Sequence, residues 1–169
     1  MAAALTRSVQ RHPGCGVTIK HYCANNQETN RFQSSSQVSH RALRELYLRG
    51  FGIAVRESHP RAVMTSYNLL NGVHTSERRD LIEDVLRAEF GFDGLVMTDW
   101  LIAQMKDRRA LHPIADSARI PASGNDVLMP GTKGDYKSIL NALHSGALDR
   151  DQVRRNVSRL IRLARELNG

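Results

Sequence analysis

Residues 91–100, with the sequence GFDGLVMTDW, constrain the fold of this chain more than any other stretch. A turn rich in glycine and aspartate is followed by the apolar or β-prone residues 95–98, a pattern typical of a buried strand in a parallel sheet. The strand ends in the carboxylate Asp99, and α/β sheets place their ligand sites at the carboxyl ends of strands. Alternatively, Asp99 could be the N-cap of a following helix.

The rest of the chain predicts strands that alternate with helices. Short apolar or β-branched runs bounded by turn residues predict strands at 16–21, 62–67 and 125–129. The spacing of apolar residues predicts helices at 3–11, 37–57, 79–90, 135–145 and 149–167. Residues 101–123 give only a partial helical signal, and Asn71-Gly72 marks a turn.

Three of these helices have clear apolar faces. The serines 34–36 can cap helix 37–57, whose apolar positions are Leu43, Leu46, Tyr47, Phe51 and Ala54. Helix 79–90 is expected to turn Leu81, Ile82, Val85 and Leu86 inward and to stop at Gly91. The last helix carries Val153, Val157, Leu160, Ile161 and Ala164 on one face, after an Asp149 cap.

This alternation indicates an α/β fold made of parallel βα units. Polar residues follow the first three strands, at 20–21, 66–68 and 99–100. In a (β/α)8 barrel the strand ends carry the active site, and such a barrel needs roughly 200–250 residues or more. The 169 residues therefore predict about half of a TIM-type barrel in a single domain, residues 1–169, and a four-unit open sheet is the alternative.

Composition argues against several classes of protein. The net charge is +7, but aromatic residues are only 5% of the chain and the basic residues are spread over helix surfaces, so no nucleic-acid partner is expected. No apolar run approaches the ~20 residues that span a bilayer. The start of the chain has no clear signal peptide, so we expect a cytoplasmic location and no membrane partner. We expect no metal and no cofactor, and we expect Cys15 and Cys23 to be reduced, buried thiols.

Each candidate site residue also has an ordinary structural interpretation. Lys20 and His21 could bind hydroxyl groups or an anion, and Lys20 could form a Schiff base, but both could simply face solvent. Met64 and Tyr67 could be core residues. Trp100 beside Asp99 suggests an aromatic platform for a sugar ring, although a lone tryptophan is often core.

Several motifs in register resemble one known family. Residues 20–28 (KHYCANNQE), 41–48 (RALRELYL), 64–68 (MTSYN) and 91–100 (GFDGLVMTDW) resemble the β-glucosidases of glycoside hydrolase family 3, in the same order and spacing. Residues 125–131, which end in Met-Pro-Gly, resemble the last barrel strand of that family. The resemblance covers nearly the whole chain and implies the second half of the catalytic barrel, as a fragment of a longer protein.

The resemblance implies a role for each candidate residue. Asp99 matches the catalytic nucleophile of a retaining β-glucosidase. Lys20 and His21 match residues that bind sugar hydroxyls in the −1 subsite, and Met64, Tyr67 and Trp100 match residues that line it. The implied substrate is a β-glucoside or an oligosaccharide.

Two parts of such an enzyme are missing from the matched motifs. The family's acid/base carboxyl comes from a second α/β domain, and the first half of the barrel contributes further sugar ligands. The chain could therefore be inactive alone, and it could assemble with the missing half or with itself. The other hypotheses are a non-catalytic half-barrel that binds sugar or a partner, and an aldolase-like half-barrel that uses Lys20.

Overall fold

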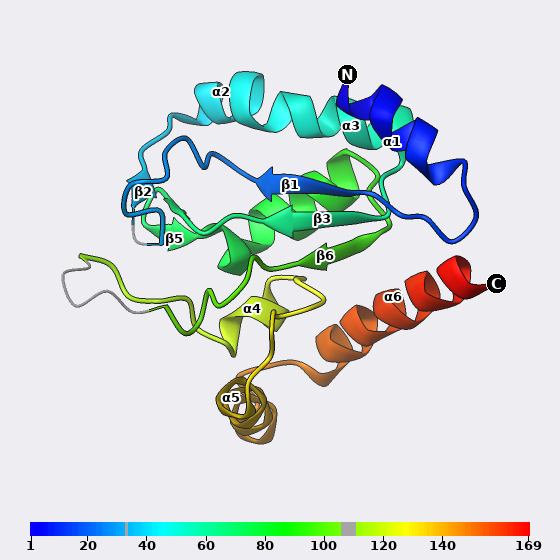
Figure 1. Cartoon of the computed structure of the whole chain (residues 1–169). Helices are drawn as coiled ribbons and strands as arrows, with labels where there is room; N and C mark the ends of the chain where they lie inside the picture. The colour runs from blue at the N-terminus through cyan, green and yellow to red at the C-terminus, as the bar shows by residue number, and fades with distance from the viewer. Residues whose placement is uncertain (33, 106–110) are drawn as a thin grey trace.

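The computed structural model describes residues 1–32, 34–105 and 111–169. Its elements (Figure 1) are α1 (Ala2–Gln10), β1 (Thr18–Tyr22), β2 (Ser35–Ser36), α2 (His40–Ala42), η1 (Leu43–Leu48), α3 (Arg49–Ser58), β3 (Ala62–Thr65), β4 (Leu69–Leu70), β5 (Val73–His74), η2 (Thr75–Glu77), η3 (Asp80–Glu89), β6 (Leu95–Met97), α4 (Arg119–Ala122), α5 (Lys133–Ser145) and α6 (Arg150–Asn168). The partial helix expected within 101–123 corresponds to α4, and residues 106–110 of that range lie outside the described residues.

The main sheet is parallel, with strand order β1-β3-β6 (Figure 1). Its register aligns Thr18 with Ala62 and Ala62 with Leu95, so the three strands start together and end within one residue of one another. Residue 94 has to be glycine, because a Cβ there would lie 2.4 Å from the Arg61 carbonyl oxygen. These features confirm parallel βα units.

The predicted fourth strand, 125–129, is wrong as a full strand. Only Val127 pairs with β6, in an isolated parallel bridge to Met97. The backbone amides of Asp126 and Val127 both donate to the Val96 carbonyl, and the Thr98 amide donates to the Val127 carbonyl. The segment then meets Pro130, which has no N–H to continue the pairing.

A second, small sheet has the strand order β2-β4-β5. β4 and β5 form an antiparallel hairpin around Asn71 and Gly72, which have φ angles of 51° and 87°. Positive φ at both central residues is what a type I′ hairpin turn requires, and this agrees with the predicted Asn-Gly turn. β2 pairs with β4 in parallel and so fixes the path of the loop after β1.

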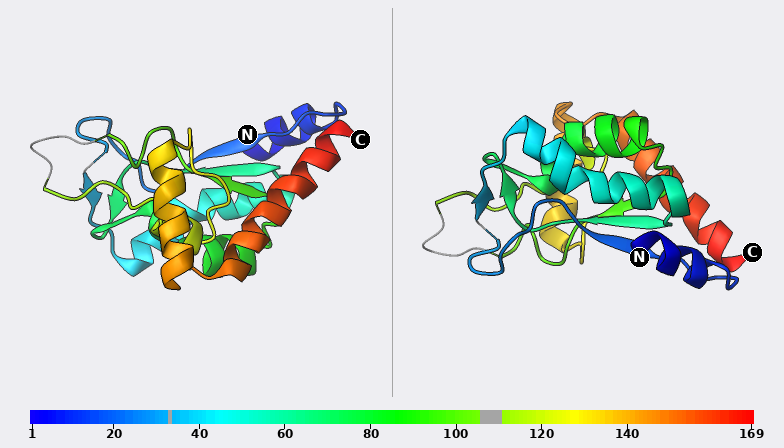
Figure 2. Two further views of the ribbon diagram at one scale, coloured as in Figure 1. Left: turned by 90° about the horizontal axis from the view of Figure 1, so that it is seen from below. Right: turned by 90° about the horizontal axis from the view of Figure 1, so that it is seen from above.

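The helices lie toward both edges of the sheet. In the view of Figure 1, α1, α2 and α3 lie toward β1, and α4, α5 and α6 lie toward β6. Figure 2 shows α5 and α6 as separate rods, and Asn156 of α6 donates to the Pro121 carbonyl of the short α4. Asp149 caps α6 as predicted, by accepting from the amides of Asp151 and Gln152.

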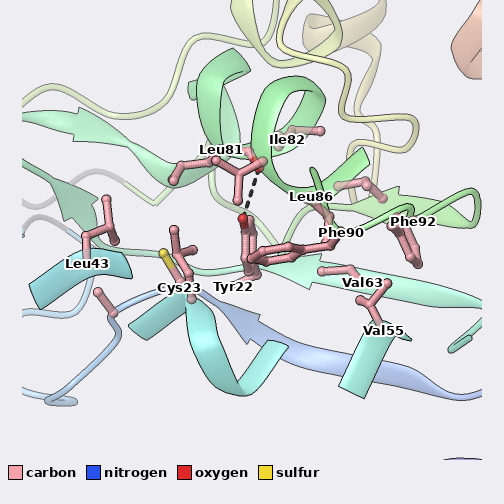
Figure 3. Close-up of a cluster of buried hydrophobic side chains, with 14 of the residues drawn as sticks. Tyr22, Cys23, Leu43, Val55, Val63, Leu81, Ile82, Leu86, Phe90 and Phe92 are labelled. Carbon is pink, nitrogen blue, oxygen red and sulfur yellow. Dashed lines mark hydrogen bonds between the residues drawn. The ribbon is translucent and has the colours of Figure 1, made fainter. Parts of the chain in front are cut away.

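The core lies between the sheet, α3 and η3 (Figure 3). Its largest fully buried member from β1 is Tyr22, whose hydroxyl donates a 2.9 Å hydrogen bond to the Leu81 carbonyl. The four residues of helix 79–90 that were expected to face inward are all buried, namely Leu81, Ile82, Val85 and Leu86. Cys23 is buried in this core as expected, but Cys15 is exposed, because it lies in the turn after α1.

Helix 37–57 differs from its prediction in its start and in its middle. Ser39, rather than the serines 34–36, caps it by accepting from the Ala42 amide at 3.2 Å. Residues 43–48 form a π-helix, whose wider turn brings Leu43 and Leu48 inward. Leu46 is therefore exposed, although the α-helical spacing predicted it on the apolar face.

Candidate active site

Asp99 lies just past the end of β6, at the edge where the parallel strands β1 and β3 also end. The preceding residue holds it in place: the Thr98 amide donates to the Val127 carbonyl, and the Met129 amide donates to the Thr98 hydroxyl at 2.9 Å. The Asp99 side chain is only 8% exposed. Its Oδ1 accepts a 2.8 Å hydrogen bond from the Trp100 amide.

The alternative that Asp99 is a helix N-cap is wrong. The next described helix is α4, which begins only at Arg119. An N-cap side chain accepts from an amide two or three residues later, whereas Asp99 accepts from the adjacent residue. Asp99 therefore has no capping role among the described residues.

His21, from β1, is the direct partner of Asp99. Its Nε2 lies 3.3 Å from Asp99 Oδ2. Burial lowers the pKa of His21 below its usual 6.5, and this outweighs the opposite effect of the Asp99 charge. The lowered pKa favours the neutral imidazole at pH 7, so the 3.3 Å contact joins a mainly uncharged ring to the carboxylate.

Tyr67 follows β3 and is the second group at this carboxylate. Burial, and then a hydrogen bond and the charge of Asp99, raise the pKa of Tyr67 to about 12. The phenol therefore keeps its proton and can donate to Asp99 over the whole neutral range. Phe32 packs edge-on against the Tyr67 ring, at 4.5 Å between centroids.

Arg31 is a site residue that the sequence did not reveal. Its guanidinium lies 4.6 Å from the centroid of the Tyr67 ring and 5.1 Å from that of Phe32. It also forms a 2.6 Å ion pair with Glu28, whose pKa is lowered mainly by that hydrogen bond. Glu28 and Arg31 lie three residues apart in a loop without periodicity, so no sequence pattern predicts the contact between Arg31 and Tyr67.

Of the other predicted residues, Trp100 bonds to Asp99 through its backbone amide, and no bond joins Lys20 or Met64 to that carboxylate among the described residues. Lys20 is exposed beside His21 and borders a surface hollow of about 270 Å³ between β1 and α3, and its positive charge contributes to the low pKa of His21. Met64 is buried on β3, where it pairs in register with Met97. Trp100 is 55% exposed, so it is not a core residue and its indole face is free to meet a ligand.

The described residues, 1–32, 34–105 and 111–169, contain no group of three His, Cys, Asp or Glu side chains that could hold a metal ion. Within the same residues, no helix has the length and apolarity to cross a membrane. The side chains gathered at the site are one buried carboxylate, a mainly neutral imidazole, a phenol and a nearby guanidinium.

The chain resembles known proteins over nearly its whole length. Residues 1–163 match the family model of the glycosyl hydrolase family 3 N terminal domain. A beta-glucosidase of Ruminococcus albus is 44% identical over 150 residues, which are 88% of this chain and 16% of that protein. Beta-glucosidase B of Emericella nidulans is 39% identical over 170 residues, which are 99% of this chain and 19% of that protein.

Solved structures show the same relationship. Beta-glucosidase 3B from Thermotoga neapolitana, in complex with glycerol, superimposes with a TM-score of 0.84 at 38% identity. That match covers 95% of this chain and 22% of the other. The chain thus spans less than a quarter of the length of the relatives it matches.

Proposed function

The chain belongs to glycosyl hydrolase family 3, and we propose that it is the part of a retaining β-glucosidase that carries the nucleophile, Asp99. The observation that carries this proposal is the buried Asp99 carboxylate at a strand end, with the His21 ring 3.3 Å away. Asp99 Oδ1 accepts from the Trp100 amide and Oδ2 lies 3.3 Å from His21 Nε2, which supports a carboxylate that is oriented before a ligand arrives. The proposed substrate is a β-glucoside.

The proposed chemistry proceeds in two displacements. An Asp99 oxygen attacks the anomeric carbon while the bond to the leaving group breaks, and a glycosyl ester forms on the enzyme. Water then cleaves that ester and regenerates the carboxylate, so the anomeric configuration is retained. In this proposal Lys20 supplies an ammonium donor to the sugar hydroxyls and Trp100 an aromatic face, and Met64 and Tyr67 line the sugar site.

The general acid has to come from outside the site residues named so far. Glu28 is the other carboxylate whose charge acts on His21, but its ion pair with Arg31 lowers its pKa. It is therefore ionised at neutral pH, whereas a general acid needs a raised pKa. We infer that residues 1–169 form about half of a (β/α)8 barrel in one domain, and that the acid/base carboxyl belongs to another part of the complete enzyme.

An activated sugar tests the nucleophile directly, because its leaving group needs no acid. The chain should react with 2-deoxy-2-fluoro-glucosyl fluoride and yield a labelled peptide that contains Asp99. Asp99→Asn should abolish the label, and Asp93→Asn, an exposed carboxylate in the same segment, should leave it unchanged. A label on Glu28 instead would overturn the assignment.

A second candidate function is sugar binding without turnover. Because Glu28 is ionised, it cannot serve as the general acid, and this favours the second candidate for the chain by itself. In that case glucose would change the fluorescence of Trp100, but no glucoside would be cleaved. The aldolase hypothesis has no support beyond the presence of Lys20, which is exposed at the edge of the site. Borohydride reduction with a ketose would leave Lys20 unmodified.

A further inference from the structure

Asp135 gathers donors from three parts of the chain. It lies in the first turn of α5 and is only 4% exposed. Its Oδ2 accepts from the Gln104 amide at 2.6 Å, and from the backbone amide and the hydroxyl of Thr132 at 2.8 and 2.7 Å. Its Oδ1 accepts from the Ser117 hydroxyl. A capping box accounts for the bonds to Thr132 alone, so those from Gln104 and Ser117 need another explanation.

Gln104 closes the turn that carries Asp99 and Trp100. The amides of Gln104 and Met105 both donate to the Leu101 carbonyl at 3.0 Å. The Leu101 amide donates to the Met129 carbonyl, also at 3.0 Å. The turn is therefore anchored at its start by the chain beside β6 and at its end by Asp135.

Ser117 connects Asp135 to the other wall of the site. Ala115 and Ile120, on either side of Ser117 in the sequence, pack in one apolar cluster with Tyr67 and Ile102. One carboxylate thus joins the turn after Asp99 and the segment behind Tyr67. Ordinary capping of α5 would not require either connection.

We propose that Asp135 is a positioning residue for this site: through Gln104 and Ser117 it fixes the turn that carries Asp99 and Trp100 and the segment that packs on Tyr67. Its effect on catalysis rests on the proposed role of Asp99. Its effect on the turn does not, and can be measured without any reaction.

The chain has a single tryptophan, Trp100, which is a reporter of the turn. Time-resolved fluorescence anisotropy of the full chain should show slow tumbling only. Asp135→Asn and Gln104→Ala should each add a fast component, whereas Thr132→Ala, which removes the cap hydroxyl but leaves Gln104 on Asp135, should not. If Thr132→Ala adds the fast component and Gln104→Ala does not, Asp135 is only a helix cap. Gln104→Ala leaves the cap of α5 intact, so it decides the question even if Asp135→Asn does not fold.

The rate of labelling by 2-deoxy-2-fluoro-glucosyl fluoride supplies the catalytic readout. In Gln104→Ala and Asp135→Asn the rate constant at saturation should fall about 10- to 100-fold, because a displacement of 1 Å can cost on the order of 100-fold in rate. The concentration that gives half the maximal rate should change little. Unchanged labelling in these variants would overturn the positioning role. If the parent chain is not labelled at all, the proposed function fails, and the anisotropy still tests the connection through Asp135.

Discussion

The Arg87 guanidinium donates a 2.7 Å hydrogen bond to Asp126, whose side chain is completely buried. The same Asp126 oxygen accepts from the Val96 amide at 2.8 Å, and the other oxygen accepts from Arg159 at 3.1 Å. One carboxylate therefore connects η3, β6 and α6. It also holds the chain after residue 125 beside the strand that leads to Asp99.

Asp126→Asn should destabilise the fold strongly. The amide can still accept from the Val96 amide, but Arg87 and Arg159 lose one of the two carboxylates that neutralise them and keep only Glu83. Breaking a buried ion pair on one side typically costs about 3–5 kcal/mol, because an uncompensated charge is left behind. Urea unfolding, followed by circular dichroism, measures this loss.

The matched control is Glu166→Gln. Glu166 pairs with Arg61 and Arg162, and all three side chains are well exposed to solvent. Such a pair is worth about 0–1 kcal/mol. If Asp126→Asn costs no more than Glu166→Gln, the buried cluster does not hold these elements together.

The pKa of His21 should move in opposite directions in two variants. Burial lowers it below 6.5, the Asp99 charge raises it, and the Lys20 charge lowers it. Asp99→Asn should therefore lower the pKa further, and Lys20→Met should raise it. An NMR titration of the ring protons, assigned with His21→Gln, measures both shifts. Equal pKa values in the parent and in Asp99→Asn would contradict the contact between the two side chains.

The same shift has a consequence for stability. Because the pKa of His21 is depressed in the folded chain, the unfolded chain binds more protons between the two pKa values. The contribution of His21 to stability is therefore complete above its ordinary value of 6.5 and is lost as the pH falls below it. His21→Gln should reduce the pH dependence of the melting temperature in this window.

Asp99, His21 and Tyr67 could be located from sequence, because each follows or ends a short apolar run and parallel strands end at one edge of a sheet. Arg31 could not. It lies in the loop that leads to β2, which pairs with β4, and strands of two residues leave no periodic pattern. The connection from Asp135 to Gln104 likewise spans segments whose pairing no local pattern encodes.

The buried face of a helix could be predicted from the sequence only where apolar side chains form that face. η3 buries the expected leucines, isoleucine and valine. α6 instead buries the polar residues Gln152 and Asn156. The Asn156 amide donates to the carbonyls of Pro121 and Asn125 at 3.0 and 3.1 Å, so its burial depends on partners distant in the sequence.

The apolar face of α6 should make the chain self-associate. Val157, Leu160 and Ile161 are 43–46% exposed on neighbouring turns of this helix. Replacing all three by glutamine, a good helix former, should shift the chain toward monomer in sedimentation velocity. The double change Arg154→Gln and Arg165→Gln alters exposed positions of the same helix and should have no such effect. A parent chain that is monomeric at all concentrations would rule this out.

Tyr67→Phe isolates the phenol hydroxyl from the packing around it. The phenylalanine ring can keep its edge contact with Phe32 and its place under the Arg31 guanidinium, so stability should change little. The lost group is a donor that stays protonated, because the pKa of Tyr67 is raised to about 12 by burial and by Asp99. A hydrogen bond to a charged group is worth about 1.5–3 kcal/mol, so the rate of labelling at Asp99 should fall roughly 10- to 100-fold.

Tyr136→Phe, at an exposed position of α5, is the matched control and should leave the rate unchanged. A Tyr67→Phe chain that is labelled as fast as the parent would show that the hydroxyl does not act on the Asp99 carboxylate during the reaction.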